Sequence, residues 1–195
     1  LFLNFDGNFK RVIKAAHSLV ILINFGFNIS ATKEISVHKD DPDKVNEIVS
    51  SVFILKGLLF VLSSLIFVFI IYLVPQAQEY KLLFLLTMYL CLSEWLFPIW
   101  YFQGIEKMKY ITILNIVNRT IFTILIFLLI KEESDYLLFA IINGIGALVT
   151  ILMAFYILFV KDKRSFYKPD NSIMIGYFKD SIPIFASNMS LKLYL

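Results

Sequence analysis

The stretch KLLFLLTMYLCLSEWLFPIWYFQGIEKMKY, residues 81–110, decides how this sequence folds. Residues 82–102 within it are mostly apolar, and about 20 such residues cross roughly 30 Å of hydrocarbon as a helix. The stretch therefore predicts a membrane-spanning helix. Glu94 and Pro98 stand four residues apart in it. Because proline has no N–H to donate, the Glu94 carbonyl loses its helical partner, which predicts a kink at Pro98.

One face of this helix carries its polar and irregular positions. An unsatisfied carbonyl and an ionisable side chain are tolerated at membrane depth only where they face protein or water. Spacings of three and four residues place five side chains on this face: Thr87, Cys91, Glu94, Pro98 and Tyr101. We expect this face to look into the protein.

The composition independently indicates an integral membrane protein. Hydrophobic residues make up 59% of the chain and charged residues 17%, and the mean hydropathy is +0.78. A soluble domain averages about 45–50% apolar and about 25% charged residues. The sequence does not begin with Met and stops within an apolar pattern at Leu195, so we expect a fragment with no signal peptide to find.

Apolar runs predict an all-α fold with five complete membrane spans. They cover about residues 12–30, 48–74, 82–102, 110–130 and 136–160. The first is the least regular, since Lys14 and His17 lie in its first two turns. We interpret His17 as a polar residue near a helix end rather than a proton relay.

A hydrophilic loop is predicted at residues 31–47. It contains His38, Asp40, Asp41 and Asp43, but their spacing fits neither a zinc site nor a calcium loop. We therefore predict a solvated loop that turns at Pro42 and no metal site.

Basic residues predict the orientation in the membrane. The segments 31–47, 103–109 and 161–172 carry nine Lys and Arg residues, whereas the alternate segments 1–11, 75–81 and 131–135 carry four. Since positive loops stay in the cytoplasm, the first set is predicted to be cytoplasmic.

Charged side chains inside the spans give the candidate site. Arg119 lies near the middle of its span and shares a helical face with Asn115, and because a guanidinium keeps its charge, we expect that face to point inward. Two roles stay open for Glu94, and they do not exclude each other: pairing with Arg119 to lock two helices together, and lining a substrate path. Lys56 either reaches the interface or faces a cavity. The candidate cavity residues are thus Arg119, Glu94, Asn115 and Lys56.

The string EWLFPIWYFQGIEKMKYITILN, residues 94–115, resembles the signature of bacterial polysaccharide flippases of the Wzx type. Weaker matches are NFGFNISATKEIS at 24–36 and YFKDSIPIFASNMSLKLY at 177–194. The resemblance implies a transporter of twelve or more helices in two pseudo-repeated lobes. Residues 1–172 would form the N-terminal lobe, and residues 173–195 would begin the second.

The same resemblance implies the function. It is the flipping of a polyprenyl-diphosphate-linked oligosaccharide across the bacterial inner membrane, for O-antigen, capsule or exopolysaccharide synthesis. The implied partners are this substrate, membrane lipids, and polymerase and chain-length proteins of the same pathway. No cofactor and no nucleic acid are expected. The alternative is a multidrug or cation antiporter of the same superfamily.

Other classes of function lack their sequence signatures. The chain contains no GxxxxGK[ST], HExxH or GxSxG motif, so neither an ATP-binding loop nor a hydrolase site is indicated. We predict no catalytic residue. A purely structural scaffold is disfavoured by the charge of Arg119 in mid-span.

Overall fold

The computed structural model describes residues 19–73, 81–131 and 136–194, which form helices and their connections without a strand. This confirms the predicted all-α fold. Residues 19–24 are helical and lead into the labelled elements. These are α2 (Phe27–Val37), α3 (Pro42–Leu73), α5 (Lys81–Leu96), α6 (Ile99–Gly104), α7 (Met108–Leu129), α8 (Tyr136–Phe155), the π-helical turn η2 (Tyr156–Lys161) and α9 (Asn171–Tyr194).

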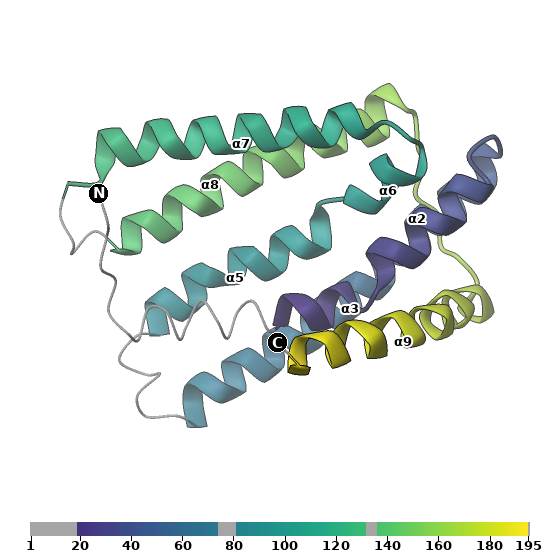
Figure 1. The fold of residues 1–195 in the computed structure, drawn as a ribbon, viewed down its shortest axis with the longest axis horizontal. Coiled ribbons are helices and arrows are strands. Elements are labelled where there is room, and N and C mark those ends of the chain that lie inside the picture. The colour runs from purple at the N-terminus through teal and green to yellow at the C-terminus, as the bar shows by residue number, and fades with distance from the viewer. Residues whose placement is uncertain (1–18, 74–80, 132–135, 195) are drawn as a thin grey trace.

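The long helices pack side by side (Figure 1). Helix α5 runs between α3 and α8, and α7 covers α8 on its other side. Helices α2 and α6 pack against each other at one end of the bundle, and α9 crosses α2 and α3. The chain therefore forms a helical bundle whose outer helices leave long apolar sides uncovered.

Three helical segments among the described residues are long and apolar enough to cross a membrane: Pro42–Phe69, Met108–Leu129 and Leu138–Lys161. Their outward side chains include Leu65, Phe69 and Phe127, which are 64%, 64% and 78% exposed. Such a surface is stable in lipid rather than in water. The chain is therefore a multi-pass membrane protein.

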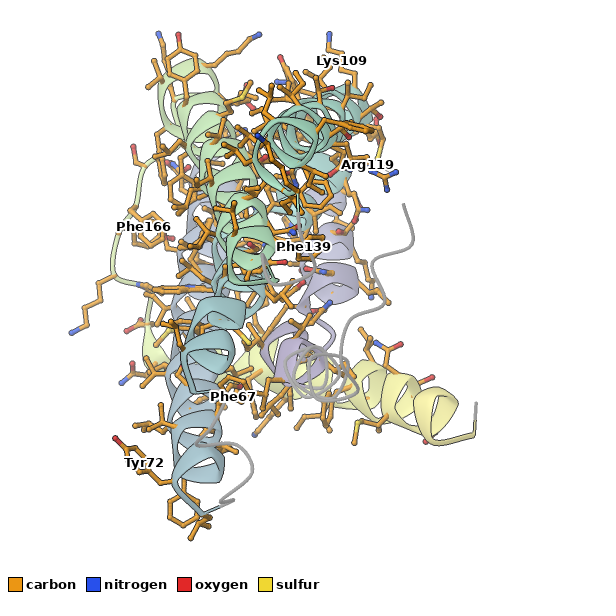
Figure 2. The ribbon with its side chains drawn as sticks, turned by 90° about the vertical axis from the view of Figure 1, so that its left-hand side faces the viewer. Phe67, Tyr72, Lys109, Arg119, Phe139 and Phe166 are labelled. Carbon is orange, nitrogen blue, oxygen red and sulfur yellow. The ribbon has the colours of Figure 1, made fainter. Side chains whose placement is uncertain are left out.

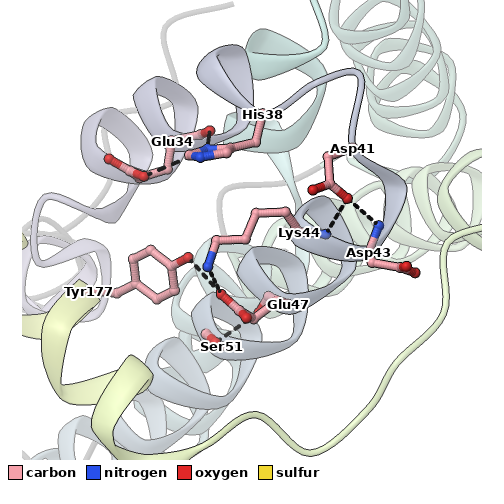
Figure 3. Close-up of polar contacts among 8 residues, drawn as sticks. All are labelled: Glu34, His38, Asp41, Asp43, Lys44, Glu47, Ser51 and Tyr177. Atoms are coloured by element: carbon pink, nitrogen blue, oxygen red, sulfur yellow. Dashed lines mark hydrogen bonds and ion pairs between the residues drawn. The ribbon is translucent and has the colours of Figure 1, made fainter.

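The predicted hydrophilic loop at 31–47 is wrong. Helix α2 continues to Val37 and α3 begins at Pro42, so only residues 38–41 connect them. The Asp41 carboxylate accepts hydrogen bonds from the backbone N–H groups of Asp43 and Lys44, both at 3.1 Å, which caps α3 (Figure 3). Proline suits the first helical position because its missing N–H would have no partner there.

The segments predicted to be cytoplasmic meet at one end of the bundle. Lys39 Nζ contacts Glu106 Oε1 at 3.1 Å, and Lys107 Nζ contacts Asp162 Oδ1 at 2.9 Å. The C-terminal ends of α3 and α7 and the N-terminal ends of α5 and α8 lie at the opposite end of the bundle (Figure 1). The structure thus shows that these segments share one end of the bundle. That this end faces the cytoplasm stays a prediction. The predictions for Lys14, His17 and the connections 74–80 and 132–135 lie outside the described residues.

The main apolar core lies at that same end. It includes Phe27 of α2, Val52 of α3, Trp100 of α6 and Leu158 of η2, none of which is more than 1% exposed. Close packing of these side chains fixes α6 against α2. The core therefore holds α2 and α6 in place at this end of the bundle.

Candidate functional site

The first break that shapes the site lies at Pro98. Helix α5 ends at Leu96 and α6 begins at Ile99, so the predicted span 82–102 consists of two helices. The backbone N–H of Phe97 still donates to the Ser93 carbonyl at 2.9 Å, but residue 98 has no N–H for the Glu94 carbonyl. Glu94 therefore stands in the last turn of α5, beside the break.

The second break lies at Phe25 and Gly26, which have φ angles of 43° and 82°. Glycine is required at position 26 because a Cβ there would lie 2.9 Å from the Ile184 side chain, in addition to adopting a left-handed backbone. Phe25 stacks on Phe178 and Phe185 of α9, at ring-centroid distances of 4.7 and 4.4 Å. These contacts turn the chain and place Asn28 in the first turn of α2.

A buried ion pair joins the elements around these two breaks. Lys56 Nζ of α3 donates to Glu94 Oε1 at 3.0 Å and to Asn28 Oδ1 at 3.3 Å, and Asn28 Nδ2 donates to Glu94 Oε1 at 3.3 Å. The Lys56 side chain is fully buried, and that of Glu94 is 21% exposed. We call Lys56, Glu94 and Asn28 the charged cluster. Charges at membrane depth are tolerated in such mutually paired arrangements.

This geometry corrects one alternative drawn from the sequence. Glu94 is not paired with Arg119 among the described contacts, because its partners are Lys56 and Asn28. Lys56 does not reach the interface either, since burial and pairing hold it inside the bundle. Of the face predicted to look inward, Cys91, Pro98 and Tyr101 are buried and Glu94 is half-buried. The Thr87 side chain lies outside what the structure describes.

A cavity of about 300 Å³ adjoins the charged cluster. Half of its lining residues are polar, and they come from α2, α5, α7 and α8: Asn28, Ser93, Glu94, Asn115, Asn118 and Thr150. The Ser93 hydroxyl is buried and has no hydrogen-bond partner among the described residues. The cavity can therefore hold polar groups in the middle of an otherwise apolar bundle.

Arg119 lies apart from this cavity, although Asn115 lines it. Thr112, Asn115, Arg119 and Thr123 are all exposed along α7, so the described residues of this chain do not cover this face. Figure 2 shows the Arg119 side chain pointing away from the bundle. It forms no ion pair with any residue that the structure describes. The described residues thus leave the guanidinium available to another group.

Sequence reasoning missed several cavity residues. Thr150 lies buried in α8 and was not among the predicted cavity residues. Asn28 follows the break at Gly26, and its pairing with Lys56 and Glu94 joins residues far apart in the sequence. A polar residue next to a glycine within an apolar span was the available signal.

These features define a class: an all-helical, multi-pass membrane protein with a charged cluster and a polar cavity between its helices. The chain belongs to the polysaccharide biosynthesis protein family, which matches residues 6–195. The family confirms the resemblance seen in residues 94–115.

Two curated relatives are similar to this chain. Both carry the name "Putative O-antigen transporter". The protein from Escherichia coli (strain K12) is 29% identical over 136 residues, which cover 70% of this chain and 33% of the relative. The protein from Shigella dysenteriae is 28% identical over 150 residues, which cover 75% of this chain and 37% of the relative. The chain thus spans about a third of the length of these relatives. No solved structure matches it.

Proposed function

We propose that this chain is part of an exporter that moves a polyprenyl-diphosphate-linked oligosaccharide across the bacterial inner membrane. The glycan would serve O-antigen, capsule or exopolysaccharide synthesis. The observation that carries the proposal is the polar cavity beside the charged cluster, set among helices that otherwise present apolar side chains. Membership of the polysaccharide biosynthesis family and the names of the two relatives support the substrate class.

The diphosphate of the proposed substrate needs a positive charge along its path. Such a group is costly to carry through hydrocarbon, and a fixed positive charge lowers that cost. Arg119 supplies such a charge in the middle of α7, with planar donors that match phosphate oxygens. Asn115 lies one turn away and lines the cavity, so it connects the Arg119 face with the polar interior.

The open face of α7 fits a chain that supplies one lobe of a larger transporter. We propose that residues 1–172 form the N-terminal lobe and that residues 173–195 begin the second. Helix α9 packs on α2 and α3, and the side chains of the Arg119 face stay exposed. A second lobe opposite α7 would enclose Arg119 and Asn115 in a central path.

A complementation assay tests the proposal. The full-length protein is expressed in a strain that makes the lipid-linked glycan in its cytoplasm but lacks its own exporter. We expect glycan to appear on the cell surface and the lipid-linked intermediate to fall. An unchanged intermediate at normal protein levels would contradict the proposal. If the same cells then gained resistance to cationic drugs, the antiporter alternative would replace it.

A further inference from the structure

A second cavity lies on the outer surface of the bundle, and its lining shares no residue with the charged cluster. It is a groove of about 450 Å³ between α3, α5 and the α8–η2 segment, and all of its lining residues are apolar. Val61 and Leu58, which line it, are 54% and 61% exposed, and Phe155, Phe159 and Phe166 line it as well. Two of its walls belong to segments long and apolar enough to cross a membrane. The groove therefore opens to hydrocarbon.

The groove is held open by fixed aromatic side chains. The Trp95 indole donates to the Phe53 carbonyl at 2.9 Å and stacks on Phe60 at 5.1 Å between ring centroids. Gly57 makes room for this indole, because a Cβ at position 57 would lie 3.0 Å from the ring. Phe53 also contacts Phe155 and Phe166 through their rings. A flexible apolar chain can thus enter without rearranging the protein.

A basic connection borders the groove at one end. Phe166 belongs to the segment between η2 and α9, and the backbone N–H groups on either side of it donate to Asn46 Oδ1 and Ser50 Oγ of α3, both at 3.2 Å. These bonds hold the connection against α3 at the groove. Lys163 and Lys168, three and two residues from Phe166, are exposed.

Those two lysines are the unpaired cations of this connection among the described residues. Asp162 is engaged by Lys107, and Arg164 Nε donates to Tyr101 Oη at 3.1 Å. The Glu47 carboxylate of α3 is likewise occupied, by Lys44 and by Tyr177 (Figure 3). Positive charge is therefore free to meet an anion beside the apolar groove.

We propose that the groove binds one acyl chain of an anionic phospholipid, with the lipid phosphate against Lys163 and Lys168. Basic pockets at the cytoplasmic interface bind anionic head groups in this way, and the predicted orientation puts this connection there. Figure 2 shows Phe166 and Arg119 on opposite sides of the bundle. A lipid in the groove is thus held away from the face assigned to the glycan carrier, so the proposal does not rest on the transport function.

Trp95 gives a direct readout, because brominated acyl chains quench tryptophan fluorescence on contact. The full-length protein is placed in phosphatidylcholine vesicles that contain a small, matched fraction of brominated phosphatidylglycerol or brominated phosphatidylcholine. The part of the fluorescence that is lost in Trp95→Phe is the Trp95 signal, and its quenching reports an acyl chain in the groove. Trp100 is fully buried, so the fluorescence removed by Trp100→Phe is the matched control.

We expect brominated phosphatidylglycerol to quench the Trp95 signal at a lower fraction than brominated phosphatidylcholine, with the Trp100 signal unchanged. Lys163→Asn and Lys168→Gln should each weaken the apparent affinity for phosphatidylglycerol roughly fivefold. Asn is used at position 163 because the backbone φ there is 51°. Val61→Phe should reduce quenching by both lipids, since it fills the groove.

Equal quenching by the two lipids would overturn the proposal, because it would mean ordinary contact with bulk lipid. A polyprenyl diphosphate is added as a competitor in a further arm. If it relieves quenching at lower amounts than unlabelled phosphatidylglycerol does, the occupant is the glycan carrier and the phospholipid assignment is wrong. Weaker competition than that of phosphatidylglycerol supports the assignment.

Discussion

Lys56 and Glu94 hold opposite charges 3.0 Å apart in the interior of an apolar bundle. Removing two charges from water is costly, and their attraction offsets that cost only when both are present. Asn28 supplies further hydrogen bonds to both of them. At the scale of single residues, the charged cluster therefore ties α2, α3 and α5 together at the level of the cavity.

The first prediction concerns this pair. Glu94→Gln should lower the free energy of unfolding by about 3–5 kcal/mol, because it leaves the buried Lys56 ammonium without its counter-charge. The double change Lys56→Met with Glu94→Gln should recover most of that loss. Thermal and denaturant unfolding in detergent micelles measures both effects.

An exposed ion pair in the same chain is the matched control. Lys39 and Glu106 lie 3.1 Å apart with side chains 40% and 67% exposed, so Glu106→Gln should cost less than about 1 kcal/mol. A loss from Glu94→Gln no larger than this would show that the buried pair does not hold the helices together.

The partners of Lys56 could not be predicted from the sequence. A lysine near the end of a span can extend to the interface, and the pairing considered for Glu94 was with Arg119. The choice depends on which faces of α3 and α5 meet, and that is decided by the breaks at Gly26 and Pro98 and by the core at Phe53 and Trp100. The sequence showed that Lys56 and Glu94 carry charge, but tertiary packing decided that they pair with each other.

At the scale of elements, two breaks border the charged cluster. Pro98 separates α5 from α6, and the left-handed backbone at Phe25 and Gly26 precedes α2. The break at Pro98 follows from the missing N–H and was visible in the sequence. The extension of α2 and α3 into residues 31–47 was not visible in the sequence. The many charged residues of this stretch favoured a loop, although Ile35 and Val45 are buried in the structure. Asp41 followed by Pro42 was the overlooked sign of a helix start.

The second prediction concerns Pro98. In Pro98→Ala the new N–H can donate to the Glu94 carbonyl, which favours one continuous helix and shifts Glu94 relative to Lys56. We expect reduced glycan export with normal membrane insertion. Export is measured as surface glycan at matched protein levels. Full export in this variant would show that the break has no mechanical role.

The third prediction concerns Gly26. Gly26→Ala should lower the free energy of unfolding by about 1–2 kcal/mol or more, because alanine is strained at φ 82° and its Cβ would press on Ile184. Gly176→Ala in α9 is the control, since a Cβ there meets nothing within 4 Å. It should stabilise the protein by up to about 1 kcal/mol through helix propensity. Equal effects of the two changes would contradict the strained turn.

At the scale of the whole molecule, the bundle has two different sides. One side presents Arg119 along α7, and the opposite side presents the aromatic groove and Phe166 (Figure 2). The long spans were predictable because apolar length alone identifies α3, α7 and α8. The exposure of Arg119 was not, because residue types do not show which face of α7 the described helices leave uncovered.

The fourth prediction concerns membrane topology. The structure brings the segments around Lys109 and Lys163 to the same end of the bundle. The excess of basic residues there predicts that this end is cytoplasmic. Reporters fused after Lys109 or after Lys163 should therefore be active only as cytoplasmic reporters. Alkaline phosphatase activity at either position would reverse the orientation.

The central claim is that Arg119 meets the substrate diphosphate, and glycan export by Arg119 variants tests it most directly. Arg119→Lys should keep part of the activity, since a point charge still attracts an anion, and Arg119→Ala should abolish export with the protein still inserted. Lys109→Ala removes a cation from the same helix near its end and should leave export intact.

Because Glu94 is paired with Lys56, Glu94→Gln should not restore export to Arg119→Gln. Surface glycan is measured for the single and double variants at matched protein levels. We predict no rescue in the double variant. Rescue there, or normal export in Arg119→Ala, would contradict the claim.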